Sequence, residues 1–256
     1  MNFKGNGIPL RDKGLDRVCA TLCVHDAEIW AVLTVETRGF GFFEDRRPQI
    51  LFERHIFHRL TSGKFDEGNA DISSEFPGGY LSGSDEYTRL EKAMALDVDA
   101  ALKSCSWGIG QVMGFNYAIS GFGSVSEMVL QMVADENAQL MAMAKFIENN
   151  NLAAALQRKN WGAFARGYNG REYKKNEYDT RLAAAYAKYS VNLPDITLRA
   201  AQAALIYLGI DPGPVDGFRG RRTLAAILAF QERYGLHLSG ELDGDTEELL
   251  FIKAFN

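Results

Sequence analysis

The sequence predicts a mainly α-helical protein: a large helical domain with a small β element, followed by a small three-helix bundle. Apolar residues recur at helical spacing through most of residues 1–190, which is typical of amphipathic helices. Residues 49–52 form a short β-capable run close to turn-forming residues. Residues 190–195 interrupt the helical pattern, and three short helical patterns follow. We therefore expect two domains, at residues 1–190 and 191–256.

Length and composition limit the possible functions. With 256 residues, 46% of them hydrophobic and 24% charged, the chain can bury a sizeable core. The net charge of −5 gives no general case for a nucleic-acid partner. The odd number of cysteines, Cys19, Cys23 and Cys105, favours free thiols in a reducing compartment. The N-terminus lacks the apolar core of a signal peptide, and charged residues interrupt the apolar run 18–35, so we expect no membrane insertion.

The first elements follow from the spacing of apolar residues near the N-terminus. Residues 1–13 are expected to form a loose arm. Two helices are predicted over residues 15–24 and 27–37, with Asp26 as the candidate N-cap of the second. Residues 61–83 contain Gly and Ser in place of periodic apolar residues, which indicates a long irregular loop of the kind that lines a groove.

Helical periodicity returns after this loop in two long stripes. They comprise Tyr87, Leu90, Met94, Val98 and Ala101, and then Val129, Met132, Val133, Leu140, Met143 and Ile147. Glu136 lies within the second stripe, where it is either a satisfied core carboxylate or part of a groove. In the second domain, residues 198–208 and 224–230 predict two helices, and Asp245 with Glu248 forms a capping box for a third. Such a bundle has little room for an active site, so we expect it to serve in attachment.

Glu36 is the candidate catalytic acid. It continues the apolar stripe of Ile29, Val32 and Leu33 at helical spacing. Partial burial disfavours the ionised carboxylate, and so does the negative end of its helix, which we expect to stop near Gly39. Both effects raise the pKa of Glu36, and a carboxyl group that keeps its proton near neutrality can serve as a general acid. The alternative is an ordinary surface glutamate in the last helical turn.

The segment SWGIGQVMG is a candidate ligand-binding wall. Its glycines let a ligand approach the backbone closely, Gln111 offers an amide donor and an acceptor, and Met113 adds an adaptable apolar surface. This mixture suits a sugar that carries an N-acetyl group. The alternative is a tight helix crossing through the glycines.

The segment WGAFARGYNG is a second candidate wall. Tyr168 is suited to stack on a sugar ring or to hydrogen-bond to Glu36, and Asn169 is suited to contact an acetamido group. The alternative is a helix end with a glycine terminator. We predict that Gln111, Met113, Tyr168 and Asn169 bind the substrate.

A second catalytic carboxylate is available at Asp45 or Glu53, although an Arg-paired structural role fits Glu53 equally well. A rival class is a zinc amidase or peptidase, which His55 and His58 alone support. Their i, i+3 spacing lacks the HExxH arrangement, so we expect no metal and no cofactor. A third class is a cell-wall binding protein without catalysis, which would leave Glu36, Gln111 and Asn169 without a role.

The order of these motifs resembles the lysozyme-like superfamily of goose-type lysozymes and soluble lytic transglycosylases. The segments VETRGFGF, ILFERH, DEYTRLEKAMALD, SWGIGQVMGFNY and FARGYNGREY resemble more closely the N-acetylmuramidase domain of phage endolysins. Residues 198–250, with RAAQAALIYLGIDPGPVDGF and GELDGDTEELL, resemble the small three-helix peptidoglycan-binding domain. Residues 218–223 depart from that domain's usual pattern because they contain more arginines.

This resemblance implies an endolysin that cleaves the β-1,4 bond between N-acetylmuramic acid and N-acetylglucosamine in peptidoglycan. It implies that Glu36 is the catalytic acid and that Gln111, Tyr168 and Asn169 line the glycan groove. A lytic transglycosylase that forms a 1,6-anhydro product is the alternative. The resemblance also implies a protein that stays in the host cytoplasm until a holin releases it to the periplasm and cell wall. We expect a monomer whose partner is the peptidoglycan glycan strand.

Overall fold

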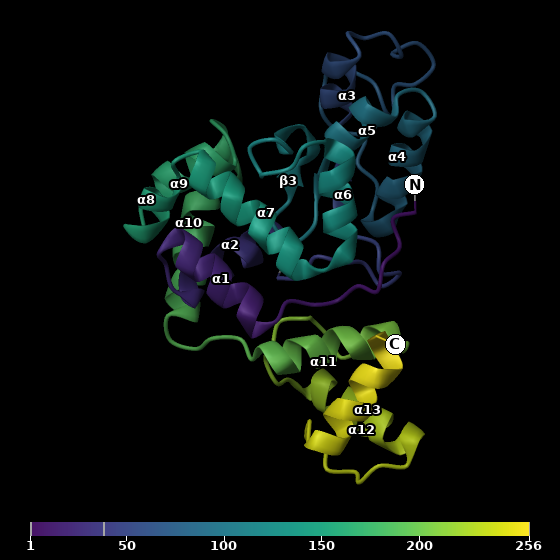
Figure 1. The fold of residues 1–256 in the computed structure, drawn as a ribbon, viewed down its shortest axis with the longest axis vertical. Helices are drawn as coiled ribbons and strands as arrows, with labels where there is room; N and C mark the ends of the chain where they lie inside the picture. The colour runs from purple at the N-terminus through teal and green to yellow at the C-terminus, as the bar shows by residue number, and fades with distance from the viewer. Residues whose placement is uncertain (1, 38, 256) are drawn as a thin grey trace.

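The computed structural model describes residues 2–37 and 39–255, and within them the fold is mainly helical with a small sheet, as predicted (Figure 1). The first helices are α1 (Asp12–Leu22), α2 (Asp26–Thr37), α3 (Arg54–Leu60), α4 (Glu86–Met94), α5 (Val98–Lys103), α6 (Val125–Ala134) and α7 (Glu136–Asn149). They are followed by α8 (Ala153–Gln157), α9 (Trp161–Tyr168), α10 (Tyr178–Tyr189), α11 (Ile196–Tyr207), α12 (Arg221–Tyr234) and α13 (Gly244–Phe255). The strands are β1 (Ile50–Phe52), β2 (Cys105–Trp107) and β3 (Val112–Met113), and the 3-10 helices are η1 (Gly83–Asp85), η2 (Gly114–Asn116) and η3 (Tyr173–Asn176).

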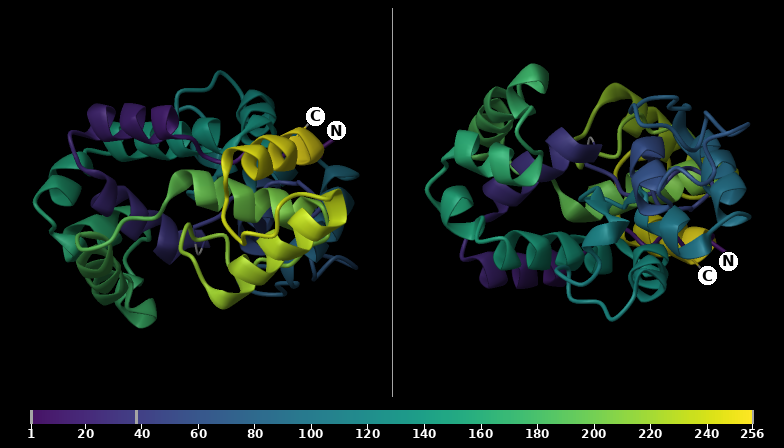
Figure 2. Two further views of the ribbon diagram at one scale, coloured as in Figure 1. Left: turned by 90° about the horizontal axis from the view of Figure 1, so that it is seen from below. Right: turned by 90° about the horizontal axis from the view of Figure 1, so that it is seen from above.

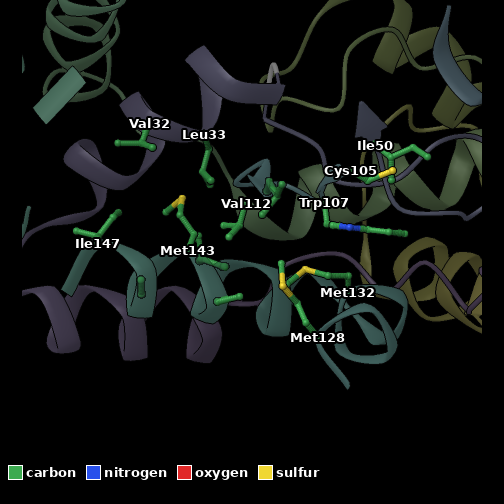
Figure 3. Packing of buried hydrophobic residues seen from close by; sticks show 14 of the residues in the cluster. Val32, Leu33, Ile50, Cys105, Trp107, Val112, Met128, Met132, Met143 and Ile147 are labelled. Atoms are coloured by element: carbon green, nitrogen blue, oxygen red, sulfur yellow. The ribbon is translucent and has the colours of Figure 1, made fainter. Parts of the chain in front are cut away.

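Helix α2 lies in the main hydrophobic core. Ile29, Val32 and Leu33 are fully buried, as their helical spacing predicts. Figure 3 shows Val32 and Leu33 facing Met143 and Ile147 of α7 across this core. Helix α10 packs along α2 as well. Helix α2 is therefore packed among other helices along its length.

The sheet is antiparallel, with strand order β1-β2-β3. Phe52 pairs with Cys105, and Trp107 pairs with both Ile50 and Val112. Strand β1 confirms the predicted β-capable run. Strands β2 and β3 were not predicted, because elements of two or three residues are too short to show a period-2 repeat.

Two groups of elements flank α2 and α7. In Figures 1 and 2, α3, α4 and α5 lie on one side of α7, and α8, α9 and α10 lie on the other, while β3 lies between the two groups in Figure 1. The segment between α3 and η1 is irregular, as predicted for residues 61–83. Among the described residues, no single helix has the length and apolar composition of a membrane span; only the pair α1 and α2, bent by 104°, meets both requirements when taken together.

The predicted loose arm at residues 1–13 is wrong. Phe3 is 5% exposed and Leu10 is fully buried in the main core. The Leu10 N–H also donates a 2.6 Å hydrogen bond to the Glu136 carboxylate. Isolated apolar residues can anchor an extended segment without any helical or strand repeat, and periodicity therefore does not reveal them.

Each long stripe predicted after the loop is divided between two helices. The Asp97 side chain caps α5 by accepting a hydrogen bond from the Ala100 N–H at 2.9 Å. The Asp135 side chain caps α7 in the same way, through the Ala138 N–H at 2.8 Å. An aspartate that bonds the backbone starts a new helix with its own axis. Val98, the first residue of α5, consequently does not continue the buried face of α4 and is 48% exposed.

Two predicted helix caps are also wrong by one or two positions. Asp26 is itself the first residue of α2, and Glu28 accepts a hydrogen bond from the His25 N–H at 3.3 Å. In α13, the side chain of Asp243 caps the first turn in place of Asp245. Helix α2 thus begins one residue earlier than the predicted cap allows, and the cap of α13 lies two residues before the predicted one; such offsets are the usual precision of a helix boundary inferred from sequence.

Helices α11, α12 and α13 form a small bundle with its own hydrophobic core, and α11 is its helix nearest the rest of the chain (Figure 1). A further apolar cluster joins the bundle to the segment after α2, through Phe40, Phe42, Ala203 and Val215. Helix α10 ends at Tyr189 and α11 begins at Ile196. The predicted domain boundary between residues 190 and 191 falls in this connection and stays a prediction.

Candidate active site

Glu36 lies in the last turn of α2, which ends one residue later. The Thr37 hydroxyl donates a 3.0 Å hydrogen bond to the Ile109 carbonyl, so this helix end is tied to the segment between β2 and β3. The Gly39 N–H donates to the Leu33 carbonyl at 3.2 Å. Gly39 has a φ of +90°, which favours glycine, and the predicted helix stop near this residue is confirmed.

The Glu36 side chain is half-buried, and its pKa is raised to about 7. Removal from water is the largest cause, because it disfavours the ionised carboxylate. A hydrogen bond from Asn169 and the positive charge of Arg181 act in the opposite direction. The carboxyl group is therefore partly protonated at neutral pH and can donate a proton. An ordinary surface glutamate does not fit this environment.

Tyr168 and Asn169 lie at the C-terminal end of α9. The Asn169 Nδ2 donates a hydrogen bond to Glu36 Oε1 at 2.8 Å, and its Oδ1 is buried without a partner among the described residues. The Tyr168 hydroxyl instead donates to the Gly110 carbonyl at 2.6 Å, and its ring stacks on Phe164. The predicted hydrogen bond between Tyr168 and Glu36 is therefore wrong, and Asn169, which we expected to contact an acetamido group, is the residue that bonds to Glu36.

Gln111 is held within the protein at both ends of its amide. Its Oε1 accepts a 2.7 Å hydrogen bond from the Ser106 hydroxyl, and its Nε2 donates to the Gly108 carbonyl at 2.9 Å. Met113 is half-buried in β3, paired with Ser106. Gln111 thus shapes the turn between β2 and β3, and its binding of substrate through the same amide, like that of Met113, stays a prediction.

Asp45 and Glu53 have partners of their own. Asp45 forms a 2.6 Å ion pair with the arginine two residues later. Glu53 accepts a hydrogen bond from the Tyr80 hydroxyl at 3.0 Å and lies 3.1 Å from His55 Nδ1, so its partners differ from the arginine that we considered. Neither carboxylate is among the groups that shift the pKa of Glu36. A role for either one as the second catalytic carboxylate stays a prediction.

Sequence reasoning missed two residues of α10 that face Glu36. The Arg181 guanidinium donates a 3.1 Å hydrogen bond to the Val35 carbonyl, and its charge lowers the pKa of Glu36. Tyr178 has a raised pKa, first through burial and then through the charge of Glu36. Their i, i+3 spacing places both on one face of a helix. That spacing was visible in the sequence, but nothing in it indicated that α10 packs against α2.

The two histidines of α3 are engaged with carboxylates. His55 Nδ1 faces Glu53 at 3.1 Å, and His58 Nδ1 faces Asp66 at 2.8 Å. Within residues 2–37 and 39–255, no group of three or more His, Cys, Asp or Glu side chains is arranged to hold a metal ion. The zinc peptidase alternative thus lacks a candidate ligand set in this part of the chain.

Comparison with known families assigns both parts of the chain. The N-acetylmuramidase family model matches residues 25–190, which is more than half of the sequence. The chain belongs to the N-acetylmuramidase family. The model of a putative peptidoglycan-binding domain matches residues 197–250 of this muramidase. The protein is thus an enzyme that degrades peptidoglycan, and peptidoglycan is its partner.

The muramidase also resembles a solved structure, the crystal structure of Burkholderia AP3 phage endolysin. The two share 38% sequence identity with a TM-score of 0.65, and the match covers 71% of each chain. A comparison with curated protein sequences finds no significant match. The family and this likeness confirm the resemblance to phage endolysins of the N-acetylmuramidase type.

Proposed function

We propose that this muramidase hydrolyses the β-1,4 bond between N-acetylmuramic acid and N-acetylglucosamine, with Glu36 as the general acid. The observation that carries the proposal is a half-buried carboxyl group, with its pKa raised to about 7, at the end of a core helix. A carboxyl group with such a pKa is protonated often enough at neutral pH to donate, and acidic enough to do so readily.

The proposed reaction begins when Glu36 transfers its proton to the glycosidic oxygen. The bond between this oxygen and C1 of the muramic acid breaks as positive charge develops on the ring, and water then adds at C1. The Asn169 Nδ2 and the Arg181 charge favour the ionised carboxylate that remains on Glu36. The unpartnered Asn169 Oδ1 is suited to accept a hydrogen bond from the N–H of an acetamido group.

A transglycosylase outcome is the second candidate. The 6-hydroxyl of the muramic acid would attack C1 and pass its proton to the Glu36 carboxylate, which gives a 1,6-anhydro product and needs no second carboxylate. Two observations favour this candidate: Asp45 is paired with Arg47, and Glu53 is engaged by Tyr80. The family assignment favours hydrolysis.

Digestion of purified peptidoglycan in ¹⁸O-labelled water separates these outcomes by mass spectrometry. Hydrolysis gives muropeptides with one ¹⁸O atom at a reducing N-acetylmuramic acid. The transglycosylase route gives unlabelled products that are lighter by one water. Reducing N-acetylglucosamine ends, or cleaved peptide stems, would contradict the proposed bond.

We also propose that the enzyme acts as a monomer that accumulates in the host cytoplasm and reaches the cell wall after a holin opens the inner membrane. The likeness to a phage endolysin supports this location. Fractionation of host cells that express the enzyme with and without a holin tests this location. Enzyme in the periplasm without a holin would contradict it.

A further inference from the structure

Arg199 connects the C-terminal bundle to the segment that follows α2. It lies on α11, and its side chain is fully buried. Its Nη1 and Nη2 donate hydrogen bonds to the two carboxylate oxygens of Glu136 at 2.7 and 2.8 Å. Its Nε donates to the Gly39 carbonyl at 2.9 Å, and its guanidinium lies 5.5 Å from the centre of the Trp30 ring. One side chain of the bundle thus contacts α2, α7 and the turn after α2.

Glu136 completes the same arrangement from the other side. It is the first residue of α7 and is fully buried. Besides Arg199, it accepts hydrogen bonds from the Leu10 N–H at 2.6 Å and the Gly41 N–H at 2.7 Å. The turn at residues 39–41 is therefore held at both ends, its first carbonyl by Arg199 and its last N–H by Glu136. These are charge-assisted hydrogen bonds, which are stronger than neutral ones.

Stability alone is a weak explanation for this ion pair. Apolar residues of similar volume often replace a buried ion pair with no loss of stability, because removing two charges from water offsets their attraction. Apolar contacts between Phe40, Ala203 and Val215 already join the bundle to this segment. The additional feature that the pair provides is geometric, because its hydrogen bonds end on the turn that directly follows the last turn of α2.

We propose that Arg199 is a positioning residue for Glu36: by holding the 39–41 turn, the docked C-terminal bundle fixes the end of α2 and keeps the acid out of water. The inference rests on the proposed catalytic role of Glu36. It gives the bundle a part in cleavage itself, besides its binding of peptidoglycan. Loss of the Arg199 contact to Gly39 should loosen the turn and admit water to the Glu36 carboxyl group.

The charged and titratable groups that interact with Glu36 come from other elements: the charge of Glu36 raises the pKa values of two tyrosines, and the charge of an arginine lowers the pKa of Glu36. Tyr168 lies on α9, and Tyr178 and Arg181 lie on α10. A change at Arg199 leaves all three in place. Because burial is the largest cause of the raised pKa of Glu36, added water should lower this pKa.

The test compares Arg199→Lys with the wild type in the full-length chain. Lysine keeps the charge, but its single ammonium group lacks the planar fork that reaches both Glu136 and Gly39. The matched control is Arg233→Lys, since Arg233 is an exposed arginine of the same bundle that donates to the Leu208 carbonyl. The substrate is a soluble tetrasaccharide of alternating N-acetylglucosamine and N-acetylmuramic acid, which measures cleavage without attachment to the wall.

For Arg199→Lys we expect kcat to fall by about tenfold or more, with KM within about twofold of the wild type. The pH at which kcat falls to half should move down by roughly half a unit or more. Arg233→Lys should match the wild type in all three quantities. If Arg199→Lys also matches it while Glu36→Gln is inactive, the positioning role is wrong and the role of Glu36 stands. If Glu36→Gln cleaves the tetrasaccharide, both proposals fail.

Hydrogen exchange on the wild type tests the same idea without a variant that has to fold. The Gly41 amide, which donates to Glu136, should exchange as slowly as the amides of the α2 interior. Exchange of the Gly41 amide at the rate of an exposed loop would show that the turn opens on its own, and the positioning role would be wrong.

Discussion

At the scale of single residues, Glu36 illustrates how a helix end can prepare an acid. The apolar stripe of α2 carries its carboxyl group into a half-buried position, and burial raises its pKa. Asn169 and Arg181 limit that rise because both favour the ionised form. The result is a group that loses its proton close to neutral pH, where it can release the proton in one step and regain it afterwards.

The pH dependence of cleavage follows from this balance. A general acid is active when protonated, so kcat should decline as the pH rises through about 7 and the Glu36 carboxyl group ionises. Initial rates on a soluble glycan between pH 5 and 9 measure the decline. A rate that stays constant up to pH 9 would mean that protonated Glu36 is not required.

The same raised pKa should make the protein less stable as the pH rises. Between pH 4.5 and about 7 the folded state holds the Glu36 proton more tightly than the unfolded state does, so the free energy of unfolding falls with pH. Glutamine has no proton to lose, so Glu36→Gln should raise the free energy of unfolding at pH 8 by roughly 2 kcal/mol. Urea unfolding at pH 5 and pH 8 checks it; an equal effect of the substitution at both pH values would contradict it.

At the scale of elements, the sequence predicted the helices better than the breaks between them. The buried stripe of α2 and its stop near Gly39 were predictable, because periodicity and a glycine are local signals. The division of the later stripes was not, because Asp97 and Asp135 preserve the apolar spacing while starting new helices. Strands β2 and β3, each of two or three residues, leave no repeat to detect.

The cap at Asp97 should contribute measurably to stability. Asp97→Ala removes the acceptor for the first turn of α5, and we expect the free energy of unfolding to fall by about 1 kcal/mol. The control is Asp99→Ala, which removes an exposed pair with Lys103 and should cost less than about 0.5 kcal/mol. Chemical denaturation of both variants measures the difference, and equal costs would argue against the cap.

At the scale of the whole molecule, the site combines residues that are far apart in the chain. Glu36 lies on α2, Asn169 follows α9 and Arg181 lies on α10. The motifs identified Glu36 and Asn169 as candidates, but the packing of α10 on α2 depends on tertiary contacts that have no local pattern. Glu136 was recognised within its apolar stripe, and the structure confirms the interpretation as a satisfied core carboxylate, but nothing in the sequence indicated Arg199 as its partner.

Because that pair and an apolar cluster join the bundle to the rest, we expect the two parts to unfold together. The three tryptophans, Trp30, Trp107 and Trp161, all precede the bundle, so their fluorescence reports on the first part alone. Far-ultraviolet circular dichroism reports on the helices of both parts. The two signals should give the same urea midpoint. A loss of helical signal that precedes the fluorescence change would mean that the bundle unfolds separately.

The most direct test of the account is the activity of Glu36→Gln on outer-membrane-permeabilised cells, followed as the loss of turbidity. Glutamine keeps the shape of the side chain but has no acidic proton, and the exposed Glu44 offers the matched control Glu44→Gln. We predict that Glu36→Gln lyses cells at least about a hundredfold more slowly than the wild type, with Glu44→Gln unchanged. Lysis by Glu36→Gln within about tenfold of the wild type would contradict the role of Glu36 as the general acid.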